Sequence, residues 1–375
     1  MLRIGKPEEA GLIAERLENA YRILAKSVEE DVLPAAGLLV SRNGVAVEPK
    51  LFGCRTNEVK APSVGPDTVF LVASVTKPVT ATAAMMLIEK GKITLDDLVV
   101  SIIPEFEPKG KDKVEVWHLL THTSGLPDQL PENIQLRKQH QGLEVYVKHI
   151  FDCNLLFSPG TSVRYQSCGL AILGEIIKRI EGVTLPEFLH REIFTPLGMK
   201  NSSLGARKDM YDKIAHVNIS KVDPEYGGPG TDWHWNTEYW WTFAAPWGGM
   251  FTTLEDYTVF LQMFLNNGFH QGRHILSPAT VAAMTSNQII GRRMIHEETR
   301  LANGWGFGWH LNNPIRSAYF GDLTSSMAYG HTGATGTAVY ADPEWDLTYV
   351  LFTTQPSPPK RLLTQCANSV MASLA

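Results

Sequence analysis

The sequence predicts an α/β (α+β) fold in which one antiparallel sheet is built from both chain termini and a mostly helical lobe is inserted between them. Segments with the features of strands occur near both ends of the chain, whereas apolar segments of helical period fill the middle. Chain termini usually lie close together, so a single sheet made from both ends is the simplest arrangement. We expect 1–75 and 305–375 to form the sheet domain, and 76–304 to form the helical region with the Tyr165 loop.

The first elements are a helix and a hairpin. Residues 8–30 place apolar side chains such as Leu17 and Leu24 on one face of a helix. Asn43 and Gly44 then separate two short apolar runs, and this dipeptide is a strong signal for a hairpin turn. We expect the strand segment that follows at 51–53 to extend the same sheet.

Four helices are predicted in the middle of the chain. Ala, Met and Leu favour a helix over 78–90, and Gly91 suits the left-handed position that ends it. A short helix is expected to stop at Gly125. Two further segments, 169–180 and 254–266, have the apolar period of buried helices.

The C-terminal part returns to the sheet. Residues 338–341 and 347–353 are rich in Val, Tyr and other strand-favouring residues, and a turn at 342–346 separates them. The last segment, 361–374, is expected to be a helix.

The composition excludes several classes of protein. With 375 residues, 44% hydrophobic and 19% charged, the chain has the composition of an ordinary globular protein with a large core. A net charge of −5 without a basic stripe speaks against nucleic-acid binding. The start of the chain shows no signal-peptide core and no segment has the apolar length of a membrane span, so we expect a cytoplasmic protein. The four cysteines are scattered and indicate neither zinc nor disulfides.

Ser74 and Lys77 are the first candidates for catalytic residues. Pro78 is acceptable only in the first turn of its helix, which places Ser74 at the helix N-terminus. Lys77 lies three residues further, about one turn away on the same face. A serine hydroxyl becomes a good nucleophile when a base takes its proton, and a neutral lysine amine within reach can be that base. Alone, a serine and a lysine three residues apart also occur by chance.

Tyr165 is the candidate for a second proton-handling group. It follows a turn at Pro159 and Gly160 and stands just before the buried helix at 169–180. A tyrosine held there can share its phenolic proton with Ser74 or with a leaving group. The alternative is a half-buried tyrosine that only packs.

A glycine-rich segment near the C-terminus is the candidate for an oxyanion site. Glycines at 330, 333 and 336 let the backbone approach a ligand closely. The segment leads into the strand at 338, and the amide of Ala334 is a natural donor to an oxyanion. The alternative is a glycine-rich turn in which His331 is exposed or packs against its neighbours.

Together these motifs resemble the serine β-lactamase and penicillin-binding-protein superfamily. The order is Ser-x-x-Lys at 74, Tyr-x-Ser at 165 and His-Thr-Gly at 331. Within the superfamily the chain is most similar to the class C β-lactamase-like branch, which includes family VIII carboxylesterases, and the resemblance covers roughly residues 8–370. Five segments carry it: 73–78, 119–126, 196–199, 248–253 and 330–333.

The resemblance implies a β-lactamase/transpeptidase-like fold and a role for each motif. Ser74 would be the acylated nucleophile, Lys77 the proton acceptor and Tyr165 the partner base and acid. The backbone N–H groups of Ser74 and Ala334 would form the oxyanion hole. No metal is expected, because His234, His270, His274 and His310 make no metal-binding pattern with nearby carboxylates, and no other cofactor is expected.

The substrate side of the site departs from the β-lactamase pattern. The resemblance implies that His331, Thr332 and Gly333 line the site beside the substrate. Asparagine is usual where Ser167 stands, and lysine is usual where His331 stands. A histidine is only partly charged near neutral pH, which makes the recognition of an anionic β-lactam doubtful. Trp247 ends an aromatic stretch that either packs a loop or forms an apolar wall for the substrate.

The predicted function is acyl transfer through a covalent acyl-serine intermediate, with water as the usual acceptor. The leading candidate is a carboxylesterase acting on small or medium esters. The alternatives are a β-lactamase or D-amino-acid peptidase/amidase, an acyltransferase, and a non-catalytic binding protein on the same fold. The expected partner is a small-molecule ester or amide, with no nucleic acid and no membrane, and the sequence does not predict the oligomeric state.

Overall fold

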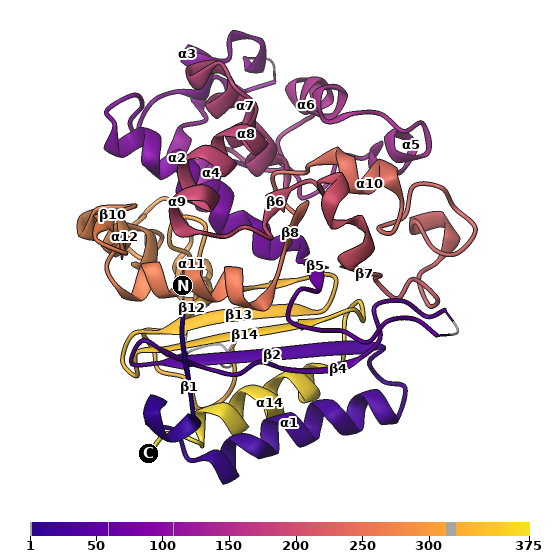
Figure 1. Ribbon diagram of the computed structural model, residues 1–375. Coiled ribbons are helices and arrows are strands. Elements are labelled where there is room, and N and C mark those ends of the chain that lie inside the picture. Colours follow the sequence, from indigo (N-terminus) through magenta and orange to yellow (C-terminus); the bar gives the residue numbers. More distant parts are fainter. Residues whose placement is uncertain (1, 59, 108, 313–319) are drawn as a thin grey trace.

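The computed structural model describes residues 2–58, 60–107, 109–312 and 320–375. Its centre is a mixed eight-stranded sheet in the order β1-β3-β2-β14-β13-β12-β11, with β4 paired to β2. Its strands come from both ends of the chain, as predicted (Figure 1). Their bounds are β1 Arg3–Gly5, β2 Ala35–Arg42, β3 Val45–Val47, β4 Lys50–Gly53, β11 His310–Leu311, β12 Tyr329–Gly333, β13 Thr337–Asp342 and β14 Leu347–Thr353.

The two ends of the chain meet in the middle of this sheet. Strand β2 pairs antiparallel with β14 over seven residues, from Arg42 opposite Leu347 to Ala36 opposite Thr353. The hairpin predicted at Asn43 joins β2 to β3. The prediction of an antiparallel sheet is wrong at one edge, where the short strand β1 runs parallel to β3. Such a pair needs a crossover, which α1 provides.

Helices α1 (Ala14–Glu29) and α14 (Lys360–Met371) cover one face of the sheet (Figure 1). The amide of Ile13 donates to the carbonyl of Ser373 at 2.7 Å, which ties the start of α1 to the end of α14. The first helix begins later than predicted, because Gly11 adopts a left-handed conformation and ends a separate 3-10 turn. The opposite face carries α11 (Leu254–Leu265) and the rest of the chain (Figure 1).

The middle of the chain is mostly helical, and the candidate site residues lie at or just before the N-terminal ends of two of its helices. These are α2 (Lys77–Glu89) and α7 (Cys168–Glu181), which are the helices predicted over 78–90 and 169–180. The other helices are α3 Val99–Ile102, α4 Val116–Leu120, α5 Asn133–Lys138, α6 Leu143–Asp152, α8 Leu185–Leu189, α9 Thr195–Leu197, α10 Glu238–Phe243, α12 Pro278–Thr285 and α13 Glu297–Ala302.

Two small sheets in this region were not predicted. One has four strands in the order β6-β8-β5-β7, and the other is a two-stranded hairpin. With two or three residues each, these strands are too short for an alternating pattern to be read. Their bounds are β5 Val69–Leu71, β6 Ser203–Leu204, β7 Ile214–Ala215, β8 Met250–Thr252, β9 Phe269–His270 and β10 Arg273–His274.

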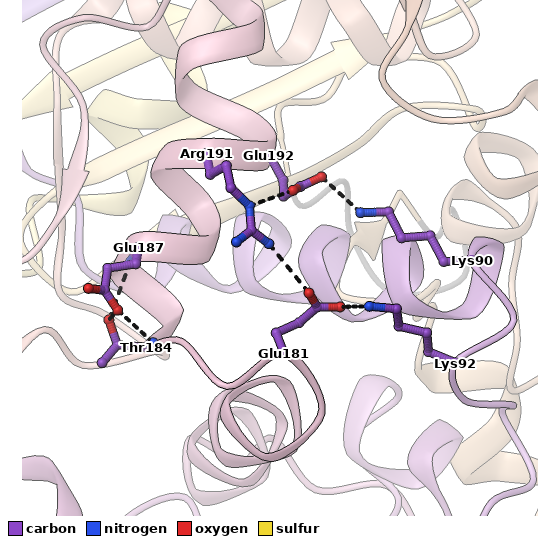
Figure 2. A network of polar contacts seen from close by, with 7 residues as sticks. All are labelled: Lys90, Lys92, Glu181, Thr184, Glu187, Arg191 and Glu192. Carbon is purple, nitrogen blue, oxygen red and sulfur yellow. Dashed lines mark hydrogen bonds and ion pairs between the residues drawn. The ribbon is translucent and has the colours of Figure 1, made fainter.

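A network of ion pairs joins the far ends of α2 and α7 (Figure 2). Lys92, just after α2, lies 2.6 Å from Glu181 at the end of α7. Lys90 lies 2.8 Å from Glu192, and Arg191 bridges both carboxylates. An isolated ion pair on the surface contributes little to stability. A network that shares the nearly buried Glu181 holds the two helices in their relative orientation more firmly than such a pair would.

None of the helices in the described parts of the chain combines the length and the apolar character that crossing a membrane requires.

Candidate active site

Ser74 lies in a tight 3-10 turn, Ala73–Thr76, between strand β5 and helix α2. The residue before it, Ala73, has a φ of 45°, in the left-handed region that non-glycine residues rarely adopt. Such a conformation costs on the order of 1–3 kcal/mol and persists only when the surroundings enforce it. The turn is therefore held in place by its neighbours rather than by its own backbone preference.

Side-chain hydroxyls from several elements enforce this turn. Four carbonyl groups around Ser74 each accept a hydrogen bond from a threonine or tyrosine hydroxyl. One donor lies in the turn between β12 and β13, one on β13, one on α11, and one in the 3-10 turn of Ser74. The bonds are Thr335 Oγ1 to Leu71 O (2.7 Å), Thr337 Oγ1 to Val72 O (2.9 Å), Thr76 Oγ1 to Ala73 O (2.7 Å) and Tyr257 OH to Val75 O (2.9 Å).

Lys77 is the first residue of α2, and its amine faces the serine. Lys77 Nζ lies 3.0 Å from Ser74 Oγ and donates to the carbonyl of Trp247 at 2.9 Å. The side chain is almost completely buried. Burial lowers the pKa of Lys77 to about 7, against a smaller opposing effect of the Asp128 carboxylate. A large fraction of the amine is thus neutral near neutral pH and can accept a proton.

Tyr165 stands on the other side of the lysine, in the loop before α7. Lys77 Nζ lies 4.6 Å from the centre of the Tyr165 ring. His122 packs against the same ring at 4.8 Å, and Trp305 packs at 5.9 Å. His122 also holds the loop itself, because its Nδ1 accepts a hydrogen bond from the amide of Gln166. The structure thus places the Lys77 amine next to both the Ser74 hydroxyl and the Tyr165 ring.

His331 is a buried and uncharged residue of β12. Burial, with a smaller contribution from the nearby Lys77, lowers its pKa to about 3. Its Nδ1 lies 2.7 Å from the carbonyl of Thr332, which can only accept, so Nδ1 carries the proton. Nε2 then presents a lone pair and has no partner among the described residues. This histidine does not supply the positive charge that lysine gives in β-lactamases.

A cavity of about 680 Å³ opens above Ser74. Tyr165, His331, Thr332, Gly333 and Ala334 line it, together with other residues of the sheet and of α14. Its described lining contains no carboxylate, and no group of three or more His, Cys, Asp or Glu side chains in the described parts of the chain could hold a metal ion.

The two amides predicted to form the oxyanion hole lie at this cavity. The N–H of Ser74 is in the first turn of its helix, where backbone amides have no acceptor within the helix. Ala334 follows β12 and is exposed in the cavity. Thr335 and Thr337 bind the carbonyls just before Ser74, which fixes the position of Ala334 relative to the serine.

Replacing Gly333 with alanine tests this arrangement. An added Cβ would overlap the carbonyl oxygen of Val72 and the hydroxyl of Thr337, so the turn must move away from Ser74. Displacing one oxyanion donor typically costs about 10²–10³-fold in kcat, and we expect a loss of about 10²-fold here. Steady-state ester hydrolysis by a folded Gly333→Ala protein measures it. Gly142→Ala, in open space, is the matched control; a kcat within twofold of wild type for Gly333→Ala would contradict the role of the turn.

Ser167 and Trp247, which were predicted to bind the substrate, are not among the residues described as lining this cavity. Ser167 Oγ donates to Asp128 at 2.6 Å, directly before α7. Trp247 contributes its carbonyl to Lys77, while its ring packs against Tyr146 and Phe243. Trp247 thus contacts the Lys77 amine and Ser167 is held by Asp128, and neither residue is among those described as lining the space above Ser74.

Four residues that support the site were not singled out from the sequence as site residues. His122 and Trp305 hold Tyr165, and Thr335 and Thr337 hold the serine turn. His122 lies in the segment 119–126 that carries part of the resemblance, and its φ of 62° marks it as unusual. Trp305 has no sequence signal, since only the folded chain brings it to Tyr165.

Comparisons with known proteins agree on one family. The family model described as Beta-lactamase matches residues 20–365. Penicillin-binding protein 4 of Amycolatopsis lactamdurans is 30% identical over 280 residues, which cover 73% of this chain and 68% of that protein. Two solved structures resemble the fold over 97% of this chain and 99% of their own. They are a penicillin-binding protein homolog from Caulobacter crescentus (TM-score 0.80, 22% identity) and a family VIII carboxylesterase (TM-score 0.77, 19% identity).

Proposed function

The chain belongs to the beta-lactamase family of serine hydrolases, and from this premise we propose that it is a carboxylesterase that forms an acyl intermediate on Ser74. The observation that carries the proposal is the 3.0 Å contact between Ser74 Oγ and a lysine amine whose pKa is lowered to about 7. This contact supplies a nucleophile with its base, and the uncharged His331 beside it suits a neutral ester.

In the proposed reaction, Lys77 Nζ takes the proton of Ser74 Oγ while this oxygen bonds to the ester carbonyl carbon. The carbonyl oxygen takes up the negative charge and accepts hydrogen bonds from the amides of Ser74 and Ala334. When the tetrahedral intermediate collapses, the bond to the alcohol oxygen breaks, and that oxygen receives a proton through Lys77 and Tyr165. Water then adds to the acyl carbon and loses a proton to the same pair, and Ser74 is released.

Uncharged His331 favours esters over β-lactams. A β-lactam needs its carboxylate held while the ring carbonyl faces Ser74, and β12 offers no cation for this. Lys360 is the only residue with a formal charge in the described lining, and it is exposed at the start of α14. A missing charge-assisted hydrogen bond costs about 1.5–3 kcal/mol, which is roughly ten- to a hundredfold in rate.

We therefore expect a higher specificity constant for p-nitrophenyl butyrate than for nitrocefin, by at least about tenfold. Both substrates are followed by their colour change in the same buffer. Lys360→Gln tests whether the exposed cation supports the residual nitrocefin activity. A wild-type protein that hydrolyses nitrocefin with the larger specificity constant would contradict the preference for esters.

A peptidase or amidase is the second candidate, because a putative D-alanyl-D-alanine carboxypeptidase of Salmonella agona is 26% identical over 96% of this chain. Its discriminating test is the hydrolysis of D-alanyl amides in parallel with the ester panel. Labelling with a fluorophosphonate probe tests the enzyme class itself, since only an activated serine reacts. Label on Ser74 together with ester turnover supports the proposal, whereas a folded protein without either would overturn it.

A further inference from the structure

The cavity above Ser74 continues around the edge of the sheet. Strand β11 covers only Tyr329 and Gly330 of β12, so the rest of the outer edge of β12 has no strand beside it among the described residues. The same cavity that Ser74 and Ala334 line reaches Tyr340 and Tyr349 on the face of the sheet that α14 covers. We call this second part, lined by Phe320, Tyr340, Tyr349, Leu363 and Ala367, the inner arm.

Two buried phenols are among the residues that line the inner arm. Tyr340 and Tyr349 lie opposite each other on β13 and β14, and their rings stack at 4.7 Å with an interplanar angle of 12°. Both residues are almost completely buried. Among the described residues neither hydroxyl has a hydrogen-bond partner of normal geometry, and the thiol of Cys366 beside Tyr349 is at best a weak partner.

Such hydroxyls cost folding free energy unless something satisfies them, and buried polar groups without a partner are uncommon. Burial raises the pKa of both phenols, so they remain protonated and can donate. The walls around them are apolar, with Phe320, Leu363 and Ala367 facing the same space. A ligand in the inner arm would therefore be an apolar chain with a hydrogen-bonding group at its end.

We propose that the inner arm binds the far end of a medium-length substrate chain that carries an uncharged oxygen there, such as a hydroxyl or a ketone. This inference rests on the esterase function proposed above. A plain alkyl end would leave both phenols unsatisfied. A carboxylate would lose its hydration without meeting a cation among the described lining residues, because Lys360 lies seven residues, about 10 Å, before Ala367 along α14.

The geometry of the sheet sets the length of this chain. Thr337 pairs with Gly333 next to the oxyanion amide, and Tyr340 is three residues further along β13. Three strand residues span about 10 Å along β13, and the chain must also pass from the face that carries Thr337 to the face that carries Tyr340, so it needs at least about eight carbons. The oxygen can belong to the acyl side or to the alcohol side of the ester, and both present the same group to the phenols.

Two ester series distinguish these sources. The first compares p-nitrophenyl octanoate with p-nitrophenyl 8-hydroxyoctanoate, and the second compares octyl acetate with 8-hydroxyoctyl acetate. In one series the wild-type specificity constant should be higher for the hydroxylated member. In the Tyr340→Phe, Tyr349→Phe double variant that ratio should fall by about tenfold, the effect of one or two lost hydrogen bonds. Tyr329→Phe, a buried tyrosine on the opposite face of the sheet, is the matched control.

Folding and function are checked separately. The double variant should melt no lower than wild type, because it removes two unsatisfied hydroxyls; a clear drop would mean that the phenols are structural and would overturn the proposal. Calorimetric titration of the Ser74→Ala protein with octanamide and 8-hydroxyoctanamide measures binding without turnover. A preference for the hydroxylated amide that the double variant loses supports the inner arm even if no ester is hydrolysed. If the wild type and the double variant hydrolyse esters with the same ratio of specificity constants for the hydroxylated and the plain member, the inner-arm proposal is wrong and the esterase proposal is unaffected.

Discussion

Replacing Ser74 with alanine is expected to lower the specificity constant for p-nitrophenyl butyrate by on the order of 10³-fold or more. The variant keeps the oxyanion amides and the cavity but has no group that can form the acyl bond. Lys77 Nζ, 3.0 Å from the lost hydroxyl oxygen, has no proton of Ser74 to accept. The same substitution should abolish labelling by a fluorophosphonate probe, which intact-protein mass spectrometry detects.

The control for this variant is Ser101→Ala, an exposed serine on α3 outside the cavity. It should retain wild-type hydrolysis and labelling. The thermal midpoint of Ser74→Ala shows that the protein is folded. Hydrolysis by Ser74→Ala within tenfold of wild type, or label recovered on another serine, would mean that Ser74 is not the nucleophile.

Much of the fold could be predicted because the decisive signals are local. The hairpin at Asn43 and the strands that became β13 and β14 follow from turn residues and strand-favouring runs. The family and the fold predicted from the ordered motifs are confirmed. The short strands β5 to β8 escaped prediction because pairs of two or three residues are set by tertiary contacts.

The site was predictable where two chemically complementary residues lie close together in the sequence. Ser74 and Lys77 meet because three residues make one helical turn. Tyr165 reaches them through a fold that no local pattern describes, and its place follows only from the resemblance. The charge of His331 was not predictable, since burial lowers its pKa to about 3 and burial is a property of the folded chain.

Replacing Lys77 with methionine is expected to lower the specificity constant by on the order of 10³-fold, because no other base lies within reach of Ser74 among the described contacts of its hydroxyl. The wild-type pH profile tests the same role. Only the neutral amine can accept a proton, so kcat/KM should rise with pH through about 7, where Lys77 loses its proton. Lys138→Met, an exposed lysine on α5, controls for the substitution. A wild-type profile that is flat from pH 5.5 to 8.5 would contradict this assignment.

The same lysine makes the stability of the protein depend on pH in a defined direction. Its pKa is about 7 in the folded protein and near the ordinary 10.5 in the unfolded chain. Between these values the unfolded chain binds a proton that the folded protein does not, so wild-type stability gains up to about 1.4 kcal/mol per pH unit from this group as the pH rises. Lys77→Met lacks this contribution. The unfolding free energy of the variant minus that of wild type, measured in urea, should therefore decrease steadily from pH 7 to pH 10. A difference that stays constant over this range would show that the amine is already charged in the folded protein, and Lys77 could then not serve as the base for Ser74.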